Sequence, residues 1–322
     1  MDYLNGSDHP PALDVSPTVE APPDSVSSYD ASIIVDSVSS PVISQHAPRV
    51  ERQLPTLVNT FIFFALAVVV TLTVGLLIVG IATLLAPHHP TDFRTLLLDP
   101  RLAIPSQAIE YLVLLAATAL LFRSIWQRPF WQTLHWNAPA VARRWIPLLA
   151  TGVALGLLNG AASNLLPMPK QAPILDDLMR STSGAWLMFL FGTTLAPLLE
   201  EIAFRGFLLP SLINFLTGRP RPAPLPENSL APLPPRQASP FIVPISILLA
   251  SIPFALLHSE QVSGAWAPVL LIGIVSVVLC IVRLWTRSLA ASAFVHATYN
   301  FTLFAGMMIA SDGFRHLEKL NN

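Results

Sequence analysis

The feature that constrains the fold most is a run of apolar residues from Leu57 to Ala86, which contains no formal charge and is closed by Pro87. A helix needs about 20 apolar residues to cross the ~30 Å hydrocarbon core of a bilayer, so this block can span a membrane. Six further apolar blocks follow: Ile104–Phe122, Trp145–Leu166, Ala185–Leu216, Phe241–His258, Ala267–Val282 and Leu289–Ala310. The chain is therefore predicted to be an all-α, polytopic integral membrane bundle of about seven transmembrane helices, with six and eight as alternative counts.

Composition supports this prediction independently. Hydrophobic residues make up 53% of the 322 residues and charged residues only 11%, against roughly 25% charged residues in soluble domains. The mean hydropathy is +0.59. The first 50 residues carry seven acids against the single base Arg49, which gives no charge basis for nucleic-acid binding. The lipid bilayer is thus an expected partner and nucleic acid is not.

The chain divides into four segments by composition. Residues 1–54 are predicted to be a disordered acidic tail rich in Ser and Pro, because scattered apolar residues cannot bury enough surface to order it. Residues 55–180 hold the N-terminal transmembrane helices, and residues 181–310 form a second transmembrane core with a Pro-rich loop at 218–240. Residues 311–322 are a short polar C-terminal tail.

The distribution of Lys and Arg predicts an orientation. With seven spans, eleven of these residues lie on the side of the N-terminal tail, Arg283 among them, and six lie on the opposite side. Cytoplasmic loops carry the excess of basic residues in membrane proteins. We therefore expect an integral protein of the plasma (inner) membrane with its N-terminus in the cytoplasm.

Three charged residues interrupt the apolar block around residue 200. Glu200, Glu201 and Arg205 are the only formal charges between Ser181 and Gly218, and a charge at bilayer depth costs at least about 2.5–3.5 kcal/mol. Positions i and i+4 share one face of a helix, so Glu201 and Arg205 are expected to form an ion pair. Glu200 lies about 100° further round the helix and has no local partner, which makes it the candidate reactive group. The alternative is a charge network that only holds helices together.

Two further pairs of residues have the same spacing. Phe254 and His258 end one apolar block, and His296 and Asn300 lie inside the last one. A lone histidine on an apolar helix is more often a hydrogen-bonded core residue than a ligand. Two intramembrane histidines beside an unpaired glutamate instead fit a hydrolytic site with a base, a water position and oxyanion donors.

Simple helix geometry raises a difficulty for that site. At 1.5 Å per residue, His258 would lie about 26 Å from the tail-side end of its block, and His296 only about 10 Å from that end. Those depths would keep the two histidines from sharing one water. Kinks at Pro244 and Pro253, tilt, or a helix that starts outside the hydrocarbon would bring them together.

Three short motifs now resemble a known family. The runs Glu-Glu-Ile-Ala-Phe-Arg-Gly (200–206), Phe-Ala-Leu-Leu-His (254–258) and His-Ala-Thr-Tyr-Asn (296–300) are similar, in order and spacing, to the motifs of the CPBP family. These are the type II CAAX prenyl endopeptidases and the bacteriocin-processing or immunity proteins, also called the ABI family. The resemblance covers about residues 185–305.

The resemblance implies an intramembrane endopeptidase of all-α fold, with residues 181–310 as its catalytic core. By analogy Glu200 would activate water and His258 would help to hold it, while His296 and Asn300 would stabilise the oxyanion. Glu201 and Arg205 would support the site. The substrate would be a membrane-associated protein or peptide, either of CAAX type or lipid-anchored.

The sequence leaves alternatives open for both the cofactor and the activity. The family is described both as metalloproteases and as metal-free glutamate peptidases, so the expected cofactor is either none or a divalent metal such as zinc. Glu200, His258 and His296 would be the ligands of such a metal. A non-catalytic membrane protein acting in immunity, regulation or scaffolding is the main alternative to an enzyme, and an ion-coupled transporter is a third.

Overall fold

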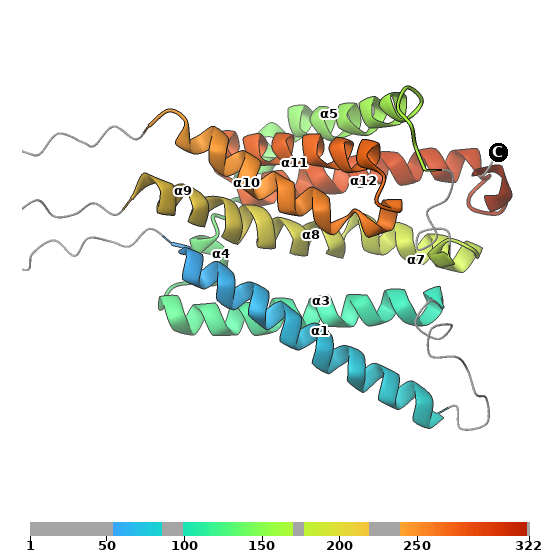
Figure 1. Ribbon diagram of the computed structural model, residues 1–322, viewed down its shortest axis with the longest axis horizontal. Coiled ribbons are helices and arrows are strands. Elements are labelled where there is room, and N and C mark those ends of the chain that lie inside the picture. Colours follow the sequence, from blue (N-terminus) through green and yellow to red (C-terminus); the bar gives the residue numbers. More distant parts are fainter. Residues whose placement is uncertain (1–53, 86–98, 170–176, 219–238, 321–322) are drawn as a thin grey trace, which may run out of the picture. The chain divides into compact units, whose positions relative to one another are not determined.

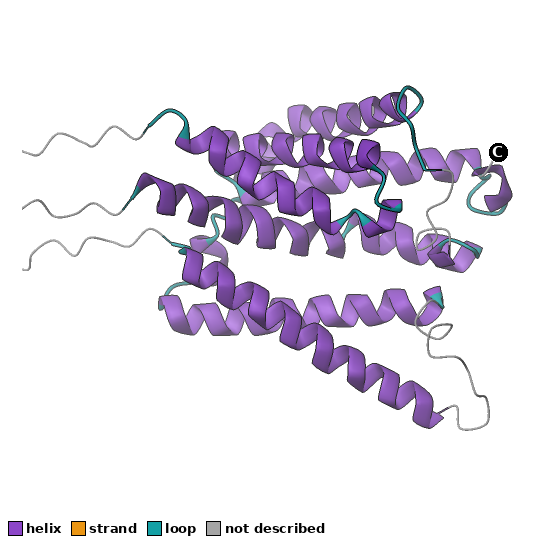
Figure 2. Ribbon diagram, in the orientation of Figure 1, coloured by secondary structure: helices purple, strands orange, loops and turns teal. Residues whose placement is uncertain are grey.

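A computed structural model of the chain describes residues 54–85, 99–169, 177–218 and 239–320. The predicted N-terminal tail up to residue 53 and most of the predicted Pro-rich loop lie outside these residues and stay predictions. Every regular element within the described ranges is a helix (Figure 2). These helices belong to one compact unit, Glu51–Asn322.

Figure 1 shows the helices of the described residues. In chain order they are α1 (Leu57–Leu85), α3 (Pro100–Trp126), α4 (Phe130–Thr133), α5 (Ala138–Ser163), α7 (Thr182–Thr193), α8 (Leu195–Glu201), the π-helix η1 (Ile202–Leu208), α9 (Leu209–Thr217), α10 (Ile242–Leu257), the 3₁₀ turn η2 (Glu260–Val262), α11 (Trp266–Thr286), α12 (Leu289–Ala310) and the 3₁₀ turn η3 (Leu317–Leu320). Side-chain caps mark several of their starts. Asp99 accepts a hydrogen bond from the Arg101 N–H at 2.9 Å, and Ser288 accepts one from the Ala291 N–H at 3.2 Å.

Six segments of the described chain are long and apolar enough to cross a membrane, namely α1, α3, α5, the continuous run α7–α9, α11 and α12. The prediction of a polytopic helical membrane bundle is thereby confirmed. The remaining predicted block, Phe241–His258, forms α10, whose 16 residues make it shorter than the other six. At 1.5 Å per residue α10 covers only about 24 Å.

The structure corrects the predicted position of Arg283. Arg283 was counted as a loop cation, but it lies within α11 and is only 8% exposed. Its Nε donates to the Arg205 carbonyl and its Nη2 to the Leu134 carbonyl, both at 3.3 Å. A basic residue near the end of an apolar block looks like a loop residue in the sequence, whereas here it satisfies buried carbonyl groups. On the seven-span prediction, the tail-side count without Arg283 is ten against six.

The most extensive helix contact among the described residues joins α5 to α12. A Cβ added at Gly152 would lie 2.6 Å from the Thr298 Cβ, and one at Gly156 would lie 2.7 Å from the Thr302 Cβ. Small residues four apart let membrane helices approach closely, since lipid provides little hydrophobic drive for their association. This contact fixes the position of α12, the helix that carries His296.

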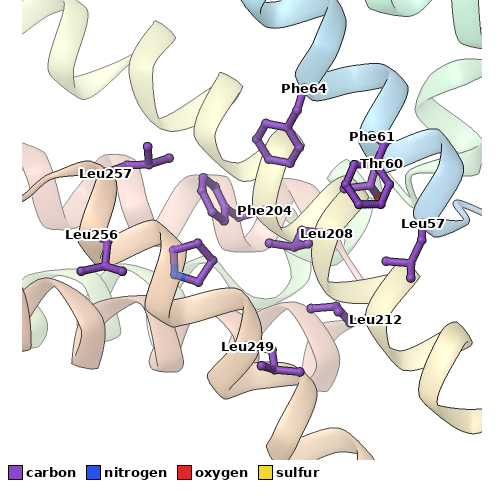
Figure 3. A pocket seen from close by; sticks show the side chains of 11 residues that line it. Leu57, Thr60, Phe61, Phe64, Phe204, Leu208, Leu212, Leu249, Leu256 and Leu257 are labelled. Carbon is purple, nitrogen blue, oxygen red and sulfur yellow. The ribbon is translucent and has the colours of Figure 1, made fainter.

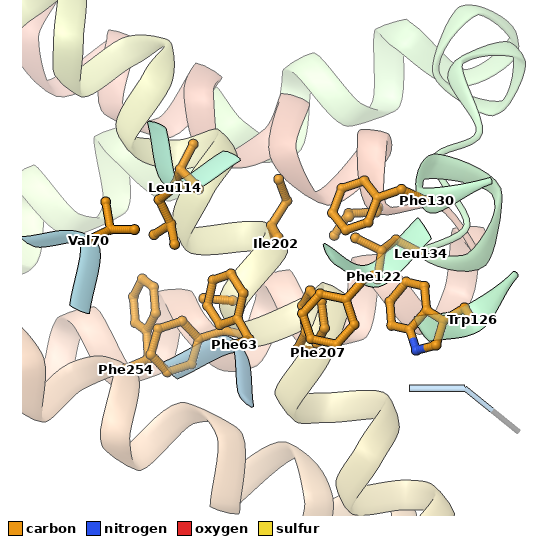
Figure 4. Packing of buried hydrophobic residues seen from close by; sticks show 14 residues of the cluster. Phe63, Val70, Leu114, Phe122, Trp126, Phe130, Leu134, Ile202, Phe207 and Phe254 are labelled. Atoms are coloured by element: carbon orange, nitrogen blue, oxygen red, sulfur yellow. The ribbon is translucent and has the colours of Figure 1, made fainter. Parts of the chain in front are cut away.

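A cluster of aromatic side chains packs the other flank of the π-helix (Figure 4). Phe207 stacks on Phe63 of α1 with ring centroids 4.8 Å apart, and it also contacts the rings of Phe122, Trp126 and Phe130. Aromatic rings bury large areas and favour defined mutual geometries. The π-helix is therefore held between α1 and α3 on one side and α10 to α12 on the other.

Candidate active site

The first motif lies where the helix geometry changes. A break at Thr194 (φ −124°, ψ −80°) separates α7 from α8, three residues before Pro197, which has no N–H to continue the hydrogen-bond ladder. Glu200 and Glu201 end α8, and the π-helix begins at Ile202. Single π-helical turns within α-helices occur frequently at functional sites, because the extra residue in the turn changes the direction of the side chains.

Glu201 and Arg205 form a fully buried ion pair. Both residues are 0% exposed, and Arg205 Nη1 lies 3.0 Å from Glu201 Oε1. Arg205 Nη2 donates to the carbonyl of Ser276 at 3.0 Å and to its hydroxyl at 2.7 Å. The guanidinium also lies over the ring of Phe254, 4.5 Å from its centroid. A buried charge pair with added hydrogen bonds of this kind offsets part of its desolvation cost.

The same carboxylate contacts the third motif. His296 Nδ1 lies 3.0 Å from Glu201 Oε1, and Ser292 donates a hydrogen bond to Glu201 Oε2. An ionised carboxylate can only accept, so Nδ1 of His296 carries a proton. Glu201 thus ties α8 to α12 and fixes the plane of the imidazole.

Glu200 occupies the more open side of the site. Its Oε2 lies 3.8 Å from His258 Nε2 and 3.7 Å from His296 Nε2, and its side chain is 22% exposed. His258 Nδ1 donates to the Phe254 carbonyl at 2.8 Å, which leaves Nε2 directed at Glu200. The three motifs of the sequence therefore converge on one carboxylate oxygen.

The expected mismatch in depth between the two histidines is wrong. It assumed that their helices begin at the same level. Phe241, before α10, is 69% exposed, whereas Leu289, the first residue of α12, is 0% exposed. The Leu289 N–H donates to the His135 carbonyl at 3.0 Å, so α12 starts inside the bundle. This offset brings His258 near the end of α10 level with His296 near the start of α12.

Asn300 is engaged elsewhere. Its Nδ2 donates to the Gly192 carbonyl at 2.7 Å, next to the break between α7 and α8. One of its two amide protons is thus used to join α12 to α7, and only the second can serve the predicted oxyanion role.

Three buried polar residues of the site were not predicted from the sequence. Ser292 contacts Glu201, Ser276 contacts Arg205, and Arg283 donates to the Arg205 carbonyl. Ser292 precedes His296 by four residues, so the shared helix face was a signal that could have identified it. Ser276 and Arg283 are seven residues apart on α11, two turns along one face.

The predicted zinc ligands lie slightly further apart than the ligands of a tetrahedral zinc ion. Tetrahedral zinc with bonds of 2.0–2.1 Å holds its donor atoms about 3.3 Å apart, whereas Glu200 Oε2 lies 3.7 and 3.8 Å from the two histidine nitrogens. Among the described residues, no group of three or more His, Cys, Asp and Glu side chains is arranged to hold a metal ion.

An apolar groove adjoins the site (Figure 3). It has a volume of about 550 Å³ and is lined by residues of α1, the π-helix, α9 and α10: Leu57, Thr60, Phe61, Phe64, Phe204, Leu208, Leu212, Leu249, Pro253, Leu256 and Leu257. Phe204 packs edge-on against Phe254 at 5.0 Å, and the Phe254 ring lies 4.8 Å from that of His258. Phe254 therefore lies between the groove and the histidines.

Comparison with known proteins agrees with these motifs. Residues 182–302, which run from α7 into α12 and include every residue of the candidate site, match the family model described as type II CAAX prenyl endopeptidase Rce1-like. Comparison with curated proteins and with solved structures gives no significant match. The chain is an integral membrane protein whose residues 182–302 are similar to the type II CAAX prenyl endopeptidase Rce1-like family.

Proposed function

We propose that this protein is an intramembrane endopeptidase that hydrolyses a peptide bond with water activated by Glu200. The observation that carries the proposal is the convergence of His258 Nε2 and His296 Nε2 on Glu200 Oε2, at 3.8 and 3.7 Å. Both separations exceed a hydrogen bond, and both are short enough for one water to contact the two groups.

The division of roles between the two glutamates follows from their surroundings. Glu201 is 0% exposed, and both of its oxygens accept hydrogen bonds from Arg205, His296 and Ser292. Glu200 is partly exposed, and the two histidines face it at longer range. A general base must reach a proton on the reacting group, so Glu200 is the base and Glu201 supports the site.

The position of the water follows from the donors and acceptors. His258 uses its Nδ1 proton on the Phe254 carbonyl, so its neutral Nε2 is an acceptor, like the Glu200 carboxylate. A water has two protons and can donate one to each group. Its oxygen lone pairs then remain available for attack on a carbonyl carbon.

These groups account for every proton transferred during the hydrolysis. Glu200 takes one proton from the water as its oxygen bonds to the scissile carbonyl carbon. The second amide proton of Asn300 donates to the resulting oxyanion, and Glu201 holds the His296 imidazole so that its Nε2 faces Glu200. Glu200 then passes its proton to the leaving nitrogen as the carbon–nitrogen bond breaks.

The groove indicates the kind of substrate. A lining of leucine and phenylalanine with one threonine and one proline accommodates an apolar chain. This supports a membrane-associated substrate, either lipid-anchored or of CAAX type. We further propose cleavage near the cytoplasmic face of the plasma membrane, with the N-terminus of the chain in the cytoplasm.

The test compares the peptide termini in membranes of cells that express the wild type, Glu200→Gln or the control Glu318→Gln. Glu318 is an exposed glutamate whose side chain is 68% accessible and which pairs with His316 outside the site. We expect a set of termini that appears with the wild type and with Glu318→Gln and is lost with Glu200→Gln. Identical termini from all three folded proteins would favour the non-catalytic alternative instead.

A further inference from the structure

Ser292 contacts the Glu201 carboxylate, which also accepts hydrogen bonds from Arg205 and His296. Its side chain is fully buried in α12, one turn before His296. Its hydroxyl donates to Glu201 Oε2, while Arg205 Nη1 and His296 Nδ1 both occupy Glu201 Oε1 at 3.0 Å. Ser292 thus donates the hydrogen bond to the second oxygen of the Glu201 carboxylate.

A carboxylate held at one oxygen alone can rotate about its terminal torsion, because that torsion is broad and has no staggered wells. Arg205 and His296 approach the same oxygen and leave this rotation free. The Ser292 hydroxyl fixes the second oxygen and thereby the plane of the carboxylate. The direction of the lone pair that faces His296 Nδ1 follows from that plane.

The Leu279 carbonyl adds a second restraint. It lies 3.1 Å from the Ser292 Oγ, on the side of α11. A hydroxyl has one proton and prefers an ionised carboxylate to a neutral carbonyl. If Glu201 becomes protonated, the hydroxyl can instead accept from Glu201 and donate to Leu279. Ser292 therefore keeps a hydrogen-bond partner in either state of the carboxylate.

We propose that Ser292 is a positioning residue for hydrolysis: it fixes the Glu201 carboxylate so that Glu201 holds the proton of His296 on Nδ1 and directs Nε2 toward Glu200. This inference rests on the proposed function for its catalytic consequence. Its structural consequence, the protonation pattern of His296, does not depend on any activity.

The structural arm measures the ¹⁵N chemical shifts of the histidines in the full chain, labelled at histidine and reconstituted in lipid nanodiscs. The His296 signals are assigned by their loss in His296→Asn. In the wild type we expect the neutral imidazole to carry its proton on Nδ1. A wild-type imidazole with its proton on Nε2 would overturn the inference without any Ser292 variant.

Ser292→Ala and the matched control Ser288→Ala then separate positioning from folding. Ser288 is an equally buried serine of the same helix, which caps its start and donates to the Asn137 carbonyl at 2.9 Å. In Ser292→Ala we expect a mixture of both neutral tautomers of His296. In Ser288→Ala we expect the wild-type tautomer and a lower thermal stability. An unchanged tautomer in Ser292→Ala contradicts the inference.

The kinetic arm uses a cleavable membrane-anchored reporter in the same nanodiscs. Loss of the partner that orients a functional histidine typically costs about 10- to 100-fold in metalloenzymes, and we expect a loss of that order in kcat with KM unchanged. If the wild type cleaves nothing while Ser292→Ala shifts the tautomer, the proposed function fails and the positioning holds. If the wild type cleaves and Ser292→Ala matches it in both arms, the positioning fails and the proposed function stands.

Discussion

Two neighbouring glutamates of one helix end have opposite surroundings. Glu201 is fully buried and accepts hydrogen bonds from an arginine, a histidine and a serine, whereas Glu200 is partly exposed and lies beyond hydrogen-bond distance of two histidines. The groups around Glu201 form what we call the closed network: Glu201, Arg205, Ser276, Ser292 and His296. The difference teaches that the chemistry of a carboxylate inside a membrane depends on how many of its lone pairs are already used.

Breaking the closed network has the largest expected effect on stability. In Arg205→Met the Glu201 carboxylate stays buried without its cation, and such losses typically cost about 3–5 kcal/mol. Thermal or denaturant unfolding in detergent, read against the wild type, measures this. The double variant Glu201→Gln with Arg205→Met leaves no unpaired charge, so we expect it to be more stable than the single variant. A single variant as stable as the wild type would show that the pair is not structural.

A substitution beside Glu200, on the more exposed side of the site, should lower kcat and leave the free energy of unfolding unchanged. His258→Gln removes the acceptor nitrogen that faces Glu200, and we expect kcat to fall by about 10²-fold, within the range for a group that acts in proton transfer. Its unfolding midpoint should stay at the wild-type value, because His258 is partly exposed. The exposed His316 provides the control His316→Gln. A fall in stability that matches the fall in rate would assign His258 to the scaffold.

A substitution in the contact between α5 and α12 should have a smaller effect on the free energy of unfolding. Gly156→Ala places a Cβ 2.7 Å from the Thr302 Cβ, whereas Gly160 has no neighbouring atom within 4 Å of an added Cβ. Overpacking of a tight contact costs about 1–3 kcal/mol, so Gly156→Ala should unfold earlier than Gly160→Ala. Equal stability of the two variants would contradict the close packing of α5 on α12.

The smallest effect is expected from removal of metal. In the proposed mechanism Glu200 activates water without a metal, so treatment of the purified protein with a chelator should change kcat by less than about twofold. Activity is measured before and after dialysis, and again after zinc is added back. A loss on chelation that zinc restores would make Glu200, His258 and His296 metal ligands.

Much of this molecule could be predicted from its sequence. The apolar blocks gave the spans because length and composition determine whether a helix can cross a bilayer. The i, i+4 spacing paired Glu201 with Arg205 because helical geometry is local. The relative levels of α10 and α12 could not be predicted, since they depend on the hydrogen bond from Leu289 to the His135 carbonyl. The π-helix and the buried Arg283 depend likewise on contacts between distant segments.

The most direct test of the central claim compares Glu200→Gln with Glu201→Gln in one preparation, measuring both kcat and the unfolding midpoint. Both changes remove one charge and keep the side-chain shape. We expect Glu200→Gln to lose about 10³-fold or more in kcat, within the range for a lost general base, at a wild-type midpoint. We expect Glu201→Gln to lower the midpoint. Wild-type turnover in Glu200→Gln, or a lowered midpoint in that variant alone, would contradict the division between the two glutamates.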